Sequence, residues 1–292
     1  SDASILITGE NGTGKEMVAR TIHQFSSRPE KPFIIINCAA IPGENLDSEL
    51  FGHEKGAFEE ATSKNKGKFE LASEGTLFLD EIGDMNIKTQ AKILRALESK
   101  TFQRIGGGRT IHMDVRLIAS TNKNLEKEIE KGTFRKELFY RINVIPVQVP
   151  PLRDRKEDIP LLVDTFLEAA SKQTTDEKKT LSQQAMDSLV EYEWQGNVRE
   201  LKNLMERLSI MIKKKVIELD NIPQPYNPVC APDIMLERPQ FFSSDNFDEA
   251  KIAFEKEYIS TLQLFSLSKY FTVSVMILRC SASPYIANEI DF

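Results

Sequence analysis

The sequence contains few cysteines and no long uncharged apolar run, and each of these absences excludes a class of protein. Its three cysteines, Cys38, Cys230 and Cys280, are odd in number and widely spaced. This argues against a disulfide framework and favours a reducing compartment. The sequence shows no run of 18 uncharged apolar residues and no basic-then-apolar leader, so we predict no membrane span. We therefore expect a soluble, cytoplasmic protein.

The sequence also lacks an excess of basic residues. Lysine and arginine number 38 against 44 aspartate and glutamate residues, which gives a net charge of -6. The chain as a whole is therefore not built to coat a polyanion, although a local basic surface is compatible with this balance. A composition of 40% hydrophobic and 28% charged residues excludes the disordered, collagen-like and coiled-coil classes. At 292 residues, the chain is long enough for about two domains.

The first 150 residues alternate short, β-branched apolar runs with helical patterns. Most of the runs have apolar residues on both faces, as expected for strands that are covered by helices above and below. This alternation predicts an α/β fold with a doubly wound parallel sheet over residues 1–150. The predicted strands are 4–7, 33–36, 76–79, 115–118 and 143–149, and two of the helices are predicted at 15–25 and 86–99.

Two prolines at 150 and 151 end that region, and the pattern then becomes helical. We predict a small all-helical lid domain at 151–224, followed by a proline-rich linker at 225–244. Residues 245–292 are predicted to form one helix and an irregular tail. The first lid helix carries an apolar stripe at helical spacing, which consists of Ile159, Leu162, Val163, Phe166, Leu167 and Ala170.

Polar residues mark the starts of two further lid helices. Ser182 is predicted to cap a helix that ends near Trp194. Asn197, with Glu200 three residues later, resembles a capping box that begins the next helix. We expect Trp194 and Leu201 to lie in the core of the lid.

A glycine-rich segment follows the first predicted strand and precedes a helix, which is the context of a phosphate-binding P-loop. Its glycines allow backbone amides to face phosphate oxygens, and Lys15 adds a positive charge at the start of the helix. The next residue is Glu16, where the general motif has Ser or Thr. The alternative is a glycine-rich turn without a ligand. The residues of the segment are Gly9, Glu10, Asn11, Gly12, Thr13, Gly14 and Lys15.

Polar pairs end two other predicted strands. Asp80 and Glu81 end the strand at 76–79, where one carboxylate could hold Mg²⁺ and the other could lie beside an attacking water. Thr121 and Asn122 follow the strand at 115–118 and could sense a γ-phosphate. A lone Asp-Glu pair after a strand usually only begins a solvated loop, but its place some seventy residues after a P-loop disfavours that alternative. Thr121 and Asn122, taken alone, could equally be an ordinary turn from strand to loop. The three histidines lack the spacing of metal ligands.

Eight segments together resemble the central AAA+ domain of NtrC/NtrX-like bacterial enhancer-binding proteins, the ATP-driven activators of sigma-54 RNA polymerase. The resemblance covers residues 1 to about 225, and Glu16 is the usual residue at its position in that family. The matching segments are Gly9–Glu16, Asn37–Ala40, Glu49–His53, Gly75–Ile82, Phe134–Arg135, Tyr140–Asn143, Pro150–Arg153 and Trp194–Leu201.

The resemblance implies an ATPase that uses ATP and Mg²⁺. It implies that Lys15 contacts the β- and γ-phosphates, that Asp80 organises Mg²⁺, and that Glu81 polarises the attacking water. It assigns Asn37 as a switch that holds the catalytic glutamate until remodelling is due. Thr121 and Asn122 would form the first sensor of the nucleotide.

The resemblance also implies an assembly and a context. Arg199 would be the second sensor, and Arg135 and Arg141 would be arginine fingers offered to a neighbouring subunit. Such a guanidinium is worth about 10³–10⁵ in rate in other phosphoryl-transfer enzymes. The family forms hexameric or heptameric rings, acts on the sigma-54 RNA polymerase holoenzyme and includes two-component response regulators.

Three departures from the family pattern stand out. Relatives have a segment before the first strand that helps to enclose the base. After residue 259 the expected helix-turn-helix is absent and only Lys269 and Arg279 are basic, as a disrupted reading frame would produce, so we expect only weak DNA binding. The sigma-factor contact loop reads Gly-Ala-Phe-Thr-Gly-Ala in relatives. Here it consists of Gly56, Ala57, Phe58, Glu59, Glu60 and Ala61.

Two hypotheses about function follow. The first is an ATP-hydrolysing transcription regulator of the sigma-54 activator type, which the intact Phe58 favours. The second is a nucleotide-dependent oligomeric regulator that no longer activates sigma-54, which Glu59 and Glu60 favour.

Overall fold

The computed structural model describes residues 2–59, 61–174 and 178–227, which all belong to one compact unit. The predicted tail at 245–292 and most of the predicted linker lie outside these residues. Within the described residues, no helix has both the length and the apolar character that crossing a membrane requires.

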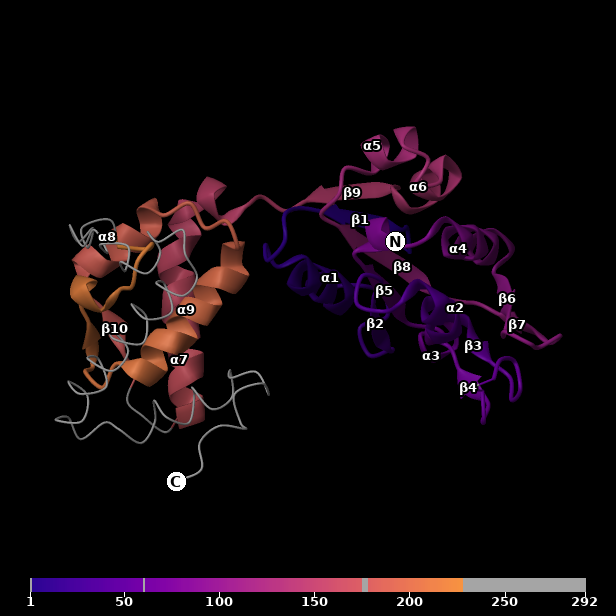
Figure 1. Ribbon diagram of the computed structural model, residues 1–292, viewed down its shortest axis with the longest axis horizontal. Coiled ribbons are helices and arrows are strands. Elements are labelled where there is room, and N and C mark those ends of the chain that lie inside the picture. The colour runs from indigo at the N-terminus through magenta and orange to yellow at the C-terminus, as the bar shows by residue number, and fades with distance from the viewer. Residues whose placement is uncertain (1, 60, 175–177, 228–292) are drawn as a thin grey trace, which may run out of the picture. The chain divides into compact units, whose positions relative to one another are not determined.

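A five-stranded sheet forms the centre of the first 150 residues (Figure 1). Its strands are parallel and lie in the order β2, β5, β8, β1, β9. This confirms the predicted doubly wound α/β fold. The strands are β1 (Ile5–Thr8), β2 (Phe33–Asn37), β5 (Thr76–Asp80), β8 (Arg116–Thr121) and β9 (Ile145–Gln148).

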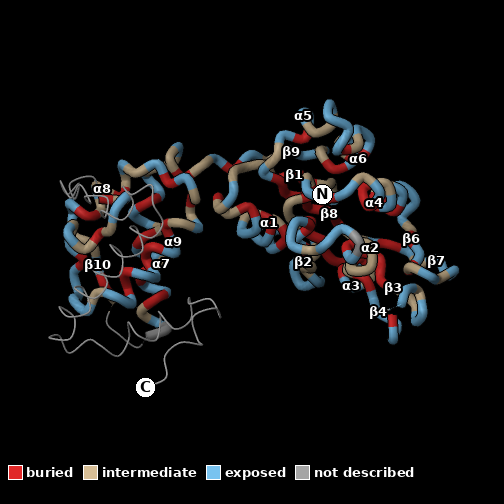
Figure 2. Tube along the Cα trace, viewed as in Figure 1, coloured by how far each residue is buried: buried red, intermediate tan, exposed pale blue. Residues whose placement is uncertain are grey.

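The strands bury both faces, because successive side chains point to opposite sides of the sheet. On one face, Ile7, Phe78 and Ile118 pack with Ala19 of helix α1 (Lys15–Gln24). The other face belongs to a larger core, whose members include Leu6, Leu77, Leu79, Leu117, Leu46, Leu50, Ile93 and Leu138. Figure 2 shows these buried segments in red along the sheet.

Helices and short strands surround the sheet. The helices are α2 (Gly43–Phe51), α3 (Lys68–Leu71), α4 (Ile87–Ser99), α5 (Leu125–Glu130), α6 (Lys136–Ile142) and the 3₁₀ turn η1 (Ile82–Asp84). The strands form two antiparallel pairs, β3 (Gly52–His53) with β4 (Asn65–Lys66), and β6 (Thr101–Gln103) with β7 (Thr110–His112).

The lid has its own hydrophobic core. Trp194 and Leu201 are fully buried in it, as predicted. The lid is not purely helical, because β10 (Thr180–Leu181) pairs in parallel with β11 (Val216–Ile217). The other elements are η2 (Leu152–Asp154), η3 (Lys156–Asp158), α7 (Ile159–Thr174), α8 (Gln183–Glu191), α9 (Asn197–Met211) and η4 (Leu219–Asn221).

One of the two predicted lid caps is confirmed and the other is wrong. The Ser182 side chain accepts a hydrogen bond from the Ala185 amide at the start of α8. The predicted cap Asn197 instead lies inside the first turn of α9, and Gly196 occupies the N-cap position. The Glu200 carboxylate accepts from the Gly196 amide (2.8 Å), so the Asn197 side chain is left available for other contacts.

Candidate active site

The carboxyl ends of the parallel strands bring the predicted site residues together at one edge of the sheet. Ligands bind at this edge in open α/β sheets. The loop between β1 and α1 needs glycine at two points. Gly12 and Gly14 have left-handed φ values of 79° and 98°. A Cβ on Gly12 would also lie 2.4 Å from the Gly196 carbonyl, so the loop has no room for a side chain there.

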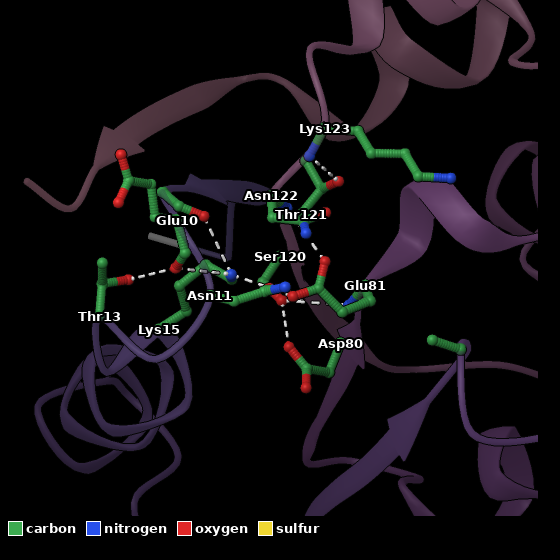
Figure 3. Close-up of polar contacts among 12 residues, drawn as sticks. Glu10, Asn11, Thr13, Lys15, Asp80, Glu81, Ser120, Thr121, Asn122 and Lys123 are labelled. Carbon is green, nitrogen blue, oxygen red and sulfur yellow. Dashed lines mark hydrogen bonds and ion pairs between the residues drawn. The ribbon is translucent and has the colours of Figure 1, made fainter. Parts of the chain in front are cut away.

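Lys15 is buried at the centre of this edge, with 6% of its side chain exposed. Its Nζ lies 3.0 Å from Glu81 Oε1 and also donates to the carbonyls of Gly9 (3.0 Å) and Glu10 (3.3 Å) (Figure 3). A buried ammonium needs an anion and hydrogen-bond acceptors. Glu81 supplies the anion, so P-loop and strand β5 are joined through a single ion pair.

Glu81 is held by two further contacts. Its backbone has a left-handed φ of 52°, which a residue without special local bonding seldom adopts. Its amide donates to Ser120 Oγ (3.3 Å), and its Oε2 accepts from the Asn122 amide (3.0 Å). The second carboxylate oxygen is therefore oriented by strand β8 while the first contacts Lys15.

Asp80 and Asn37 form a separate hydrogen-bonded pair. Ser120 Oγ donates to Asp80 Oδ1, and Asn37 Nδ2 lies 3.3 Å from Asp80 Oδ2. Asn37 Oδ1 accepts from the amides of Ala39 (2.9 Å) and Ala40 (3.0 Å). Asn37 thus contacts the predicted metal ligand, and its role as a switch on Glu81 remains a prediction.

Negative charge gathers next to this pair. Cys38 is buried, and burial together with the charges of Asp80, Asp84 and Glu81 raises the pKa of its thiol to about 12. The thiol therefore stays protonated at neutral pH, and Cys38 contributes to the core rather than to nucleophilic chemistry. Glu81 pairs with Lys15 and Asp84 with Lys123, so among the described residues Asp80 is the one of these three carboxylates without an ion pair.

The donor set at Asp80 fits Mg²⁺. This ion is usually held by one or two carboxylates together with substrate phosphates, rather than by an all-protein cage. The described residues contain no group of three or more His, Cys, Asp or Glu that could hold a metal ion. Glu16 is exposed and forms an ion pair with Arg20 (2.8 Å). We therefore do not count its carboxylate among the ligands expected to hold Mg²⁺.

The predicted first sensor lies beside the two carboxylates. Thr121 is fully buried, and its Oγ1 accepts from the Lys123 amide (3.1 Å). Asn122 is exposed and contributes its backbone amide to Glu81. Figure 3 shows both residues on the same side of the site as Glu81.

A polar network that the motifs did not predict joins the P-loop to the lid. Both carboxylate oxygens of Glu10 accept from the Arg153 guanidinium, at 2.5 and 2.9 Å. Asn197 Nδ2 donates to Glu10 Oε2 (3.1 Å) and to the Asn11 carbonyl (3.0 Å), and its Oδ1 accepts from the Leu152 amide (2.8 Å). The hydrogen bonds from Arg153 and Asn197 lower the pKa of Glu10 to about 2.

Two backbone contacts extend this network. Arg155 Nη2 donates to the Thr13 carbonyl (2.7 Å), and the Arg199 amide donates to the Gly12 carbonyl (3.2 Å). The Arg199 side chain is exposed, at the start of α9. Lid residues thus contact the P-loop directly. A change in the conformation of the loop on nucleotide binding would therefore alter these contacts with the lid.

The two predicted arginine fingers lie at opposite ends of α4. Arg135 Nε donates to the Ile87 carbonyl (3.3 Å), and Arg141 Nη2 donates to the Leu97 carbonyl (3.0 Å). Those carbonyls are ten residues apart on one helix, or about 15 Å at 1.5 Å per residue. In this conformation the two guanidinium groups are therefore far from one another.

The predicted contact loop is folded back on itself. The amides of Gly56 and Ala61 donate to the carbonyls of Ala61 (2.8 Å) and Phe58 (2.9 Å), respectively. Phe58 is 41% exposed, and its ring packs edge-on against His53 with 4.9 Å between centroids. Glu59 is exposed, and Glu60 lies outside the described residues.

Comparison with known proteins gives two family matches that together span most of the described chain. Residues 1–148 match the Sigma-54 interaction domain, and residues 153–229 match an AAA+ ATPase lid domain. The chain is 51% identical over 231 residues to the regulatory protein AtoC of Escherichia coli (strain K12). This match covers 79% of this chain and 50% of AtoC. The chain is also 51% identical over 220 residues to the DNA-binding transcriptional regulator NtrC of Azospirillum brasilense, which covers 75% of this chain and 46% of that protein.

A solved structure agrees with these matches. The crystal structure of NtrX from Brucella abortus in complex with ATP superposes with a TM-score of 0.73 at 39% identity, over 91% of this chain and 58% of NtrX. The chain spans about half the length of the curated relatives it matches.

Proposed function

The chain belongs to the sigma-54 activator family of AAA+ ATPases, and from that premise we propose that it binds and hydrolyses ATP to remodel sigma-54 RNA polymerase holoenzyme. The observation that carries this proposal is the ion pair between Lys15 and Glu81, set between the P-loop and the ends of β5 and β8. It places a cation for phosphate and a carboxylate for water within 3.0 Å of each other. The further proposal of a cytoplasmic, ring-forming regulator rests on the family.

The contacts of Lys15 suggest how nucleotide binding prepares the site. A phosphate oxygen offers the buried ammonium a stronger partner than the Gly9 and Glu10 carbonyls do. As Lys15 turns to the β- and γ-phosphates, Glu81 Oε1 loses its partner while Oε2 stays fixed by the Asn122 amide. Glu81 can then accept a hydrogen bond from water and orient it toward the γ-phosphate.

Asp80 is the residue that would hold Mg²⁺, with Ser120 and Asn37 orienting its carboxylate. When bound, the ion would neutralise charge that develops on the phosphate oxygens. Asn37 can exchange its contact with Asp80 for another partner, since its amide is exposed. This is consistent with the switch that the family resemblance assigns to it.

Completion of the site requires a second subunit. Neither Arg135 nor Arg141 contacts a P-loop residue among the described parts of its own chain, and both donate to α4 carbonyls. We propose that at least one of them reaches the nucleotide of a neighbouring subunit in a ring. Hydrolysis per subunit should then depend on assembly.

A second candidate function is favoured by the contact loop. Glu59 is exposed beside Phe58, where the family has threonine, and Glu60 replaces a glycine. A chain with this loop could hydrolyse ATP and assemble while failing to engage sigma-54. The two candidates share the nucleotide site and differ only in what the loop can contact.

ATP turnover measured across protein concentrations tests the proposal. We expect the rate per subunit to rise as monomers assemble, and Lys15→Ala to abolish nucleotide binding. Lys127→Ala is the matched control, because Lys127 is an exposed lysine on α5. A rate per subunit that stays constant from demonstrated monomer to oligomer would contradict the shared site. Unchanged nucleotide binding by Lys15→Ala would contradict the site itself.

A further inference from the structure

A polar cavity lies at the opposite edge of the sheet from the proposed nucleotide site. Its volume is about 410 Å³, and Arg116, the first residue of β8, lines it. Thr121 ends the same strand at the nucleotide edge. At about 3.3 Å per residue, the two ends of this strand are roughly 17 Å apart. The cavity is therefore separate from the P-loop.

Arg116 is the unusual residue of this cavity. It is only 7% exposed, and its Nε has no hydrogen-bond partner in the part of the chain that the structure describes. Among those residues it also forms no ion pair. A buried charge is costly unless it is paired and hydrogen-bonded. Burial accordingly lowers the pKa of the Arg116 guanidinium, and the charge of the Asp2 carboxylate opposes this shift only in part.

The charges around Arg116 leave an excess of positive charge. Two carboxylates line the cavity, Asp2 and Asp114, but both are bound to Arg28 at 2.7 and 3.3 Å. Arg28, Lys100, Arg116 and Arg141 are the cationic residues of the lining in the described conformation, in which Arg141 donates to the Leu97 carbonyl instead of reaching a neighbouring subunit. Four cations against two carboxylates leave two positive charges, which matches the charge of a phosphate dianion near neutral pH.

We propose that this cavity is a second anion site, which takes a phosphate group through Arg116 with Lys100 at its rim. The volume lies in the range of small-molecule sites, so the phosphate can be free or carried by a small metabolite. The guanidinium offers a planar fork of donors that suits phosphate oxygens. Arg28 is already bound by two carboxylates and two backbone carbonyls. It therefore forms part of the cavity wall and is not the residue that we expect to bind the phosphate.

Titration of the chain with inorganic phosphate tests this site when the P-loop is disabled by Lys15→Ala. Calorimetry at constant ionic strength should show saturable binding to Lys15→Ala. Binding to the double variant Lys15→Ala/Arg116→Gln should be at least tenfold weaker. In phosphate-free buffer the Arg116→Gln change should not lower the melting temperature, because it removes an unpaired buried charge. A drop in melting temperature would indicate a structural partner for Arg116 and would overturn the proposal.

Lys100→Asn, added to the Lys15→Ala variant, provides a second test in which no buried residue is changed. Lys100 is exposed and has a left-handed φ of 52°, which asparagine tolerates. It should weaken phosphate binding by a few fold. Lys88→Asn, an exposed lysine at the other end of α4, should leave the binding unchanged.

A parallel titration with AMP distinguishes the two sources of the phosphate group. Tighter binding of AMP than of inorganic phosphate assigns the cavity to a phosphorylated metabolite, and the reverse order assigns it to free phosphate. Absence of saturable binding of both ligands to Lys15→Ala would overturn the proposal. Equal phosphate binding by the Arg116→Gln and Lys100→Asn variants and their parent would do the same.

Discussion

The nucleotide edge of the sheet and the contact loop at 56–61 differ in which residues hold them in place. At the nucleotide edge, Lys15, Glu81 and Asp80 each have two or more partners, and those partners come from different segments of the chain. The contact loop is closed by hydrogen bonds within its own backbone, Phe58 packs on His53, and Ala61 is buried. A substitution at the exposed Glu59 is therefore expected to disturb few other residues. From this comparison we expect that the proposed ATP hydrolysis and the proposed contact with sigma-54 can change independently.

The largest expected effect concerns Arg135, which tests whether the nucleotide edge is complete only in an assembly. Arg135→Ala should lower ATP turnover by about 10³-fold or more, since a positioned guanidinium stabilises charge on the transferring phosphoryl group. Nucleotide binding by the variant should persist, because Arg135 does not contact its own P-loop. Steady-state hydrolysis above the assembly concentration is the measurement. A loss of ATP turnover of less than tenfold relative to Lys127→Ala would contradict the proposal that Arg135 acts at a nucleotide site.

Removal of the Glu81 carboxylate should have the next largest effect. Glu81→Gln keeps the shape of the side chain and loses the charge that orients water, so hydrolysis should fall by about 10²–10⁴-fold. ATP affinity should be retained or increased, because Lys15 is released from its ion pair with Glu81. Filter binding and single-turnover hydrolysis separate these two quantities. Parallel losses of affinity and turnover would point to a structural role for Glu81.

A smaller effect is expected from the contact between P-loop and lid. Glu10→Gln weakens the hydrogen bonds with Arg153 and Asn197. It should lower turnover by less than about tenfold, since an ion pair in which Arg153 is 35% and Glu10 is 44% exposed contributes little. The matched control is Glu126→Gln, an exposed glutamate on α5. Equal effects of the two variants would show that the contact does not transmit nucleotide binding.

The same contact predicts a pH dependence. The folded-state pKa of Glu10 is lowered from 4.5 to about 2, so its contribution to stability is complete above about pH 4.5. It is lost as pH falls toward 2. The melting temperature of the native protein should therefore exceed that of Glu10→Gln by a small margin, about 2 °C or less, at neutral pH. This margin should vanish near pH 2, and a margin that grows on acidification would reverse the assignment.

Much of the nucleotide edge could be predicted from the sequence because its residues follow strands in short motifs. Lys15, Asp80 and Glu81 all lie where the strand pattern places them. The network around Glu10 could not be predicted in this way. Arg153 and Asn197 are 143 and 187 residues away from it along the chain, and no local pattern links them.

Two other residues show the same limit. Asn197 has the residue type and spacing of a cap, but its amide finds better partners on the P-loop than on its own helix. Arg116 lies in an apolar strand pattern, and nothing in that pattern reveals that its guanidinium is buried without a hydrogen-bond partner at Nε. In both cases the surroundings of the side chain depend on tertiary contacts, which the residue type and the local sequence pattern do not reveal.

The smallest effect on hydrolysis is expected in the contact loop. The double change Glu59→Thr/Glu60→Gly should alter ATP turnover by less than about twofold, because Glu59 is exposed and none of the described nucleotide-site contacts involves the loop. Its effect should appear in partner binding instead. In a ring of about six subunits, roughly twelve carboxylates would meet near the axis and repel one another over the screening length of about 8 Å. The substitution also restores a glycine at the loop tip.

Capture of sigma-54 by the assembled protein in the presence of an ATP transition-state analogue tests most directly whether hydrolysis and partner contact are separable here. Co-elution on size exclusion is the readout. If the loop separates the two activities, as in the second candidate function, the native chain hydrolyses ATP but does not co-elute with sigma-54, whereas Glu59→Thr/Glu60→Gly does so only with the analogue. Analogue-dependent co-elution of the native chain, together with open-complex formation on a sigma-54 promoter, would contradict that separation and support the first candidate, a working activator.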